Sequence, residues 1–122
     1  VEAYRVLEDL QRQGLVRSIG VSNCTIEDLE ALAAAGTSVP VVNQLEVNPF
    51  LFRSKTIAYC QEKGIAVQAY RALGNGKHFA HPLLVRIANK HGKTVPQVMG
   101  RFLLDQDIIA IVKSSKPERV QE

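Results

Sequence analysis

Residues 108–119 are Ile108-Ile109-Ala110-Ile111-Val112-Lys113-Ser114-Ser115-Lys116-Pro117-Glu118-Arg119, an apolar run followed abruptly by polar and charged residues. Four of the first five residues are β-branched, which is typical of a strand buried on both faces in a parallel sheet. Ser115 and Glu118 then have the spacing of a capping box, with a proline between them, so we expect a helix to begin there. This segment therefore predicts a buried strand that runs directly into a helix N-terminus.

Three cations, Lys113, Lys116 and Arg119, surround this predicted helix start. The helix dipole favours acidic side chains in the first turn by about 0.3–1 kcal/mol per charge, so a bound anion would relieve the conflict. With the hydroxyls of Ser114 and Ser115, the cations form a donor set that suits a phosphate group. On these residues alone, a solvated basic loop is the favoured interpretation, because charged turns are common.

The composition predicts one globular domain, since 122 residues that are 46% hydrophobic can bury a core. The net charge of +3 comes from basic residues interleaved with acids, so nucleic-acid binding is not indicated. No apolar run approaches the roughly 18 residues of a membrane span, and the start lacks both a signal peptide and an initiator Met. We expect a soluble, cytoplasmic protein cut from a longer one. Cys24 and Cys60 lack metal-ligand spacing, and we expect both thiols to be reduced.

Strand patterns alternate with helix patterns along the chain. The expected strands cover 18–23, 41–47, 65–70 and 108–112; the expected helices cover 2–13, 25–36, 54–63, 82–92 and a segment that begins at Thr94. The spacing of Thr25 with Asp28 and of Thr94 with Gln97 predicts two capping boxes, Ser54 is expected to cap the third helix, and Ala33 is expected to face inward on the second. The first three strands start 23 and 24 residues apart, and the last gap holds a Gly-rich loop and two helices. Such alternation predicts an α/β fold with a parallel sheet and right-handed crossovers.

Polar residues lie inside or at the carboxyl ends of these strands. Asn43, Gln44 and Glu46 would each cost about 1–3 kcal/mol if buried without partners, so they must reach either a ligand or a partner within the sheet. Polar strand ends fit a (β/α)8 TIM barrel, in which they carry the active site. A whole barrel needs eight strands and roughly 250 residues, so this chain supplies about four parallel strands, or half.

Several motifs closely resemble the aldo-keto reductases. They are residues 14–23 (Gly-Leu-Val-Arg-Ser-Ile-Gly-Val-Ser-Asn), Val42-Asn43-Gln44-Leu45-Glu46, Gln68-Ala69-Tyr70, His91-Gly92-Lys93-Thr94, Arg101-Phe102, and the segment from Val112 to Glu122. The resemblance covers almost all of this chain but only the C-terminal half of the family barrel, so it predicts that residues 1–122 are the cofactor-binding half.

The resemblance implies an NADP(H) site. In similar enzymes the counterparts of Ser22, Asn23 and Gln44 hydrogen-bond the nicotinamide carboxamide, and the counterpart of Tyr70 stacks beneath the ring. The remaining expected cofactor contacts are Arg71, Leu73, Lys113, Ser114, Ser115, Arg119 and Glu122. Cations at the expected 2′-phosphate position favour NADP(H) over NAD(H), because Arg and Lys recognise a localised anion.

Two departures from the family pattern affect this prediction. Where family members often have Tyr-Ser-Pro-Leu-Gly, this chain has Tyr70-Arg71-Ala72-Leu73-Gly74, which puts the pyrophosphate contact in doubt and makes Arg71 itself a candidate phosphate ligand. The catalytic Asp, Tyr, Lys and His of similar enzymes lie on the first half of the barrel, and no segment here matches them. We therefore predict no catalytic residue in this chain, and no metal site, although His78 and His81 are spaced as a possible pair.

The resemblance implies that the complete form is an oxidoreductase that reduces an aldehyde or ketone by hydride transfer. The chain alone is expected to be inactive, and to pair with the missing N-terminal half-barrel or to self-associate through its open sheet edges. A non-catalytic regulatory or structural member of the same fold, or a proteolytic or cloning fragment, remains an alternative.

Overall fold

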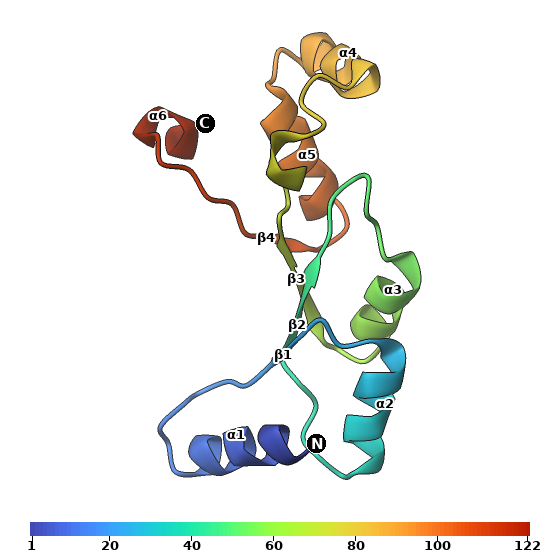
Figure 1. The fold of residues 1–122 in the computed structure, drawn as a ribbon, viewed down its shortest axis with the longest axis vertical. Helices are drawn as coiled ribbons and strands as arrows, with labels where there is room; N and C mark the ends of the chain where they lie inside the picture. Colours follow the sequence, from blue (N-terminus) through green and yellow to red (C-terminus); the bar gives the residue numbers. More distant parts are fainter. The chain divides into compact units, whose positions relative to one another are not determined.

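The computed structural model describes residues 1–122 (Figure 1). Its elements are α1 (Glu2–Arg12), β1 (Val21–Ser22), α2 (Ile26–Ala34), β2 (Val42–Glu46), α3 (Ser54–Glu62), β3 (Ala66–Tyr70), the 3-10 helix η1 (Gly74–Gly76), α4 (Pro82–His91), α5 (Val95–Leu104), β4 (Ile109–Ala110) and α6 (Pro117–Gln121). The chain divides into two compact units: unit 1 contains residues 1–45 and 53–67, and unit 2 contains residues 46–52 and 68–122. None of the helices combines the length and the apolar character needed to cross a bilayer.

The strands confirm the predicted parallel βα organisation. In unit 1, β1 pairs with β2 in parallel, with Val21 opposite Asn43. In unit 2, β3 pairs with β4 in parallel, with Ala69 opposite Ala110. Within each unit, the two paired strands are consecutive in the sequence. Parallel neighbours require crossover connections, which the intervening helices supply.

Unit 1 is built around a capped helix and a small apolar core. The predicted capping box is present at α2, where the Thr25 hydroxyl accepts from the Asp28 N–H at 3.2 Å and the Asp28 carboxylate accepts from the Thr25 N–H at 2.8 Å. The core groups the side chains of Tyr4, Ile19 and Leu32. The apolar face of α2 is narrower than predicted: its Ala33, expected to face inward, is exposed.

Gly20, directly before β1, lies close to the backbone of Val42 in β2. A Cβ on Gly20 would lie 2.8 Å from the Val42 carbonyl oxygen and would overlap the Val42 side chain, so only glycine fits there without movement. The regular strand is shorter than the predicted 18–23 span and covers only Val21–Ser22. Helix α3 also differs from prediction, because Ser54 is its first helical residue and Arg53 is its N-cap, with no capping hydrogen bond from a side chain.

Unit 2 packs α4 against α5, which lie together at the top of Figure 1. Helix α4 begins at Pro82 and ends at Gly92, whose φ of 59° supplies the left-handed C-cap. The predicted capping box at Thr94 is also present in α5. Met99, Leu103 and Ile108 are almost fully buried and form much of the core of this unit.

The segment from Ile108 to Arg119 differs most from prediction. Ile108 is 1% exposed, but Ile109 is 48% and Val112 is 61% exposed, so the strand is not buried on both faces. The regular strand β4 is also short and covers only Ile109–Ala110, which pair with β3. Ser115 does not cap the following helix. The N-cap of this helix, α6, is Lys116. Proline favours an extended conformation in the residue before it and itself favours the first helical position, so Pro117 begins the helix.

Candidate functional site

Three of the predicted cofactor contacts meet at the carboxyl ends of β1 and β2. The backbone N–H of Asn23 and the hydroxyl of Ser22 both donate to the carbonyl oxygen of Gln44, at 2.9 Å and 3.0 Å. Asn23 has a φ of 56°, and this left-handed conformation turns the chain from the strand toward α2. Ser22 and Asn23 are exposed and Gln44 is half-buried, so their side chains are accessible at this strand end.

Asn43 lies beneath this turn and is fully buried. Its Nδ2 donates to the Cys24 carbonyl oxygen at 3.0 Å, and its Oδ1 accepts from the Cys24 N–H at 3.4 Å. Nδ2 also lies 3.8 Å from the sulfur of Cys60. The Asn43 side chain thus has partners within the protein. Of the two possibilities for a polar strand residue, a ligand or a partner within the protein, Asn43 has the second. It fixes the backbone of the residue that follows Asn23.

A small cavity of about 80 Å³ opens beside this turn, lined by Asn23, Cys24, Thr25, Leu45, Arg53 and Thr56. Cys24 is half-buried and Cys60 is buried, and the structure has both as free thiols. Burial raises the pKa of the Cys24 thiol, and the nearby Asp28 carboxylate raises it further. Burial also raises the pKa of Cys60. Thiolate is the reactive form of cysteine, so neither side chain is set up as a nucleophile.

In unit 2, the predicted contacts follow the carboxyl ends of β3 and β4. The Ile111 N–H donates to the Ala69 carbonyl oxygen at 2.9 Å, so the two strands leave the sheet at the same edge. Tyr70 ends β3 and is half-buried, and the predicted Leu73 contact three residues later is also half-buried. The segment after β4 carries Lys113 in an exposed position.

The donor set after β4 has few acceptors within the protein. Lys113, Lys116 and Arg119 form no ion pair with a carboxylate, which is consistent with an anion site as well as with a solvated loop. The Ser114 hydroxyl accepts from the Lys116 N–H at 3.1 Å and so ties the loop to itself. Ser115 is exposed. Glu122 is exposed too, and its backbone carbonyl accepts from the Gln97 side chain at 2.9 Å.

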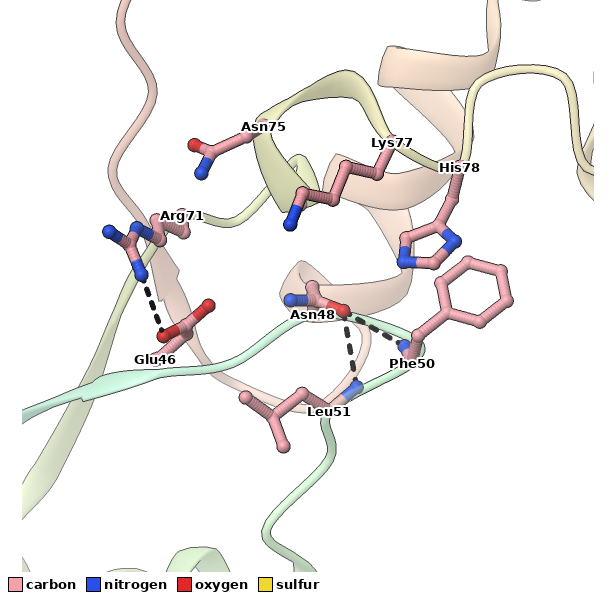
Figure 2. Close-up of a pocket in the computed structure, with 9 residues that line it drawn as sticks. Glu46, Asn48, Phe50, Leu51, Arg71, Asn75, Lys77 and His78 are labelled. Carbon is pink, nitrogen blue, oxygen red and sulfur yellow. Dashed lines mark hydrogen bonds and ion pairs between the residues drawn. The ribbon is translucent and has the colours of Figure 1, made fainter.

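A second cavity of about 190 Å³, here called the Asn48 pocket, lies in unit 2 (Figure 2). Its lining residues are Glu46, Asn48, Phe50, Leu51, Arg71, Gly74, Asn75, Lys77 and His78. Arg71 has a φ of 49°, and its guanidinium contacts the Glu46 carboxylate at 3.2 Å. Glu46, like Asn43, therefore has a partner within the protein.

The two histidines of the His78-x-x-His81 pair contact one aromatic ring. Phe50 stacks on His78 with 3.8 Å between ring centroids and meets His81 edge-on at 5.0 Å. No group of three or more metal-ligating side chains gathers in the chain.

Sequence reasoning did not single out Asn48 and Lys77, which line the Asn48 pocket. The available signal was position, because both follow the carboxyl ends of strands, where ligands bind in parallel α/β folds.

Comparison with known proteins gives a consistent result over the whole chain. The profile of the Aldo/keto reductase family matches residues 1–122. The chain is 41% identical over 121 residues to the uncharacterized oxidoreductase YtbE of Bacillus subtilis, covering 99% of this chain and 43% of that protein. It is 37% identical to a glyoxal reductase of the same organism, covering 99% of this chain and 44% of the relative.

Solved structures agree in fold. The apo form of Gox0644 superposes with a TM-score of 0.93 at 37% identity, covering 99% of this chain and 45% of that one. A Gox0644 mutant in complex with NADPH gives 0.90 at 36% identity, covering 96% of this chain and 43% of that one. The chain thus spans less than half the length of the relatives it matches, and its fold matches part of their barrel. With a family match over its full length, this chain belongs to the aldo/keto reductase family.

Proposed function

We propose that this chain is the C-terminal, NADP(H)-binding half of an oxidoreductase that reduces aldehydes or ketones by hydride transfer. The cofactor would supply the hydride, and the residues of this chain would bind and orient it. The observation that carries the proposal is the likeness to a relative in complex with NADPH, at 36% identity and a TM-score of 0.90. A glyoxal reductase among the relatives supports a carbonyl substrate.

The donor chemistry of both units fits a dinucleotide. In unit 1, accessible amide and hydroxyl groups of Ser22, Asn23 and Gln44 suit the nicotinamide carboxamide, which both donates and accepts hydrogen bonds. In unit 2, Tyr70 supplies an aromatic face at a strand end. Lys113 and Arg119 supply cationic donors that no carboxylate neutralises, which suits the 2′-phosphate that distinguishes NADP(H) from NAD(H).

The other tyrosines are less suited to act on a carbonyl. Tyr4 is 5% exposed within the core of unit 1. Tyr59 lies on α3, and the ammonium of Lys63 lies 5.5 Å from its ring centroid, one helical turn away. Neither is at a strand end, where barrel enzymes place catalytic groups. We therefore assign this chain to cofactor binding and no residue of it to proton transfer.

Cofactor discrimination tests the proposal. The double variant Lys113→Met with Arg119→Met should weaken NADPH binding by about 1.5–3 kcal/mol per lost charged contact, while NADH binding changes little. Fluorescence titration with each cofactor measures both affinities. The matched control is Arg86→Met with Lys90→Met, which removes the same two charges from α4. Equal weakening of both cofactors, or no binding of either by the unmodified protein, would contradict the assignment.

A further inference from the structure

Helix α6 and the loop that leads to it have little contact with the rest of unit 2. Every residue of α6 is exposed, and none of its side chains is buried. Within the segment, the Ser114 hydroxyl accepts from the Lys116 N–H, and the Arg119 N–H donates to the Lys116 carbonyl oxygen. A helix of five residues is too short to persist alone in water, so a contact outside the segment must hold it.

That contact comes from Gln97, in the first turn of α5. Its Nε2 donates to the backbone carbonyl oxygen of Glu122 at 2.9 Å. This is the one hydrogen bond between residues 113–122 and the rest of the protein, and no ion pair adds to it. Figure 1 shows the long extended connection that leads from β4 to α6. The place of α6 therefore depends on a single side chain.

The other end of the same amide completes the capping box of α5. Gln97 Oε1 accepts from the Thr94 N–H at 3.0 Å. A backbone N–H can only donate and a backbone carbonyl can only accept, so the two partners fix which end of the amide is which. Glutamate would complete the capping box equally well, because a carboxylate also accepts from the N-cap N–H. It has no N–H to offer Glu122, so glutamine alone can join the two helices.

We propose that Gln97 is a positioning residue for the cofactor: it holds α6 at the start of α5 and thereby fixes the place of Arg119. The inference rests on the function proposed above, in which Arg119 contacts the 2′-phosphate. Gln97 acts only through the backbone of Glu122 and touches no cofactor itself. On an unanchored α6, the guanidinium would have to be ordered when the cofactor binds, and the entropy of that ordering would weaken the affinity.

Two variants separate the two ends of this amide. Gln97→Glu keeps the acceptor for Thr94 and removes the donor to Glu122, so the urea midpoint should not fall while α6 becomes mobile. Thr94→Ala removes the hydroxyl that accepts from the Gln97 N–H, so the midpoint should fall while α6 stays in place. The ¹H–¹⁵N heteronuclear NOE of the backbone amides of residues 119–121 measures this mobility. It should drop well below the values of α5 in Gln97→Glu alone.

Cofactor titration supplies the second measurement. In Gln97→Glu the affinity for NADPH should fall by about threefold to tenfold, the usual effect of losing one hydrogen bond. In Thr94→Ala it should stay within about twofold. Gln121→Glu is the matched control for charge, because it places the same carboxylate on α6 and leaves the contact between Gln97 and Glu122 intact. It should keep the NOE values of the unmodified protein and weaken NADPH binding less than Gln97→Glu does.

Three results would overturn the proposal. The first is an α6 that is as rigid in Gln97→Glu as in the unmodified protein, and the second is a mobile α6 with unchanged NADPH affinity. The third is an equal loss of affinity in Gln121→Glu, which would assign the effect to charge. Failure of the unmodified protein to bind NADPH would refute the function proposed above and the positioning role with it, whereas the NOE values would still show whether Gln97 anchors α6.

Discussion

Replacing Asn43 by alanine should lower the free energy of unfolding by about 2–4 kcal/mol. The side chain makes two hydrogen bonds to the backbone of Cys24, at 3.0 Å and 3.4 Å, each contributing about 1 kcal/mol net. Truncation also leaves the part-buried N–H and carbonyl of Cys24 without these partners, which adds about 1–3 kcal/mol of desolvation penalty if water does not enter. Urea denaturation followed by circular dichroism measures the loss.

Asn89→Ala is the matched control, because Asn89 is exposed on α4 and its side chain makes no hydrogen bond; the change should stay within about 0.5 kcal/mol. A second readout is the rate of alkylation of Cys24, which should rise in Asn43→Ala as the turn loosens. A loss below about 0.5 kcal/mol with an unchanged alkylation rate would refute the view that Asn43 holds this turn.

Further changes test the elements that frame the site. Gly20→Ala should destabilise the protein by about 1–3 kcal/mol in the same assay, because the new Cβ meets the Val42 carbonyl oxygen at 2.8 Å; an unchanged midpoint would contradict that contact. Thr94→Ala should cost about 1 kcal/mol by removing the cap of α5, and Thr94→Ser should restore most of it. The Thr25 N–H holds the pKa of Asp28 below its ordinary value of 3.8. The unfolded chain then binds more protons, so this contribution is present above the ordinary pKa and is lost as pH falls through the folded value. Asp28→Asn should therefore flatten part of the acid dependence of stability below about pH 4, and an identical acid profile would rule this out.

Local features of the fold were predictable from sequence, and features set by distant neighbours were not. The capping boxes at Thr25 and Thr94 involve residues three positions apart, so the sequence contains all the information that they need. The exposure of Ile109 and Val112 depends on what packs over their side chains. Periodicity records that a segment is apolar, but not what lies beside it in space.

The same distinction applies to the site. Ser22, Asn23 and Gln44 were predicted together from the resemblance to the aldo-keto reductases, and the structure brings them to one edge of the sheet. The Asn48 pocket forms from two segments, 46–51 and 71–78, that only the fold brings together.

Arg71 combines a left-handed backbone conformation with a charged side chain at the rim of the Asn48 pocket. A side chain with a left-handed φ costs roughly 1–2 kcal/mol relative to glycine, and Arg71 adopts 49° directly after β3. Glycine would remove that strain and would also remove the guanidinium from the pocket rim. A library of variants at this position, selected for heat resistance alone, should therefore enrich glycine and lose the charge, so greater thermal stability here would come with loss of the guanidinium that contacts Glu46.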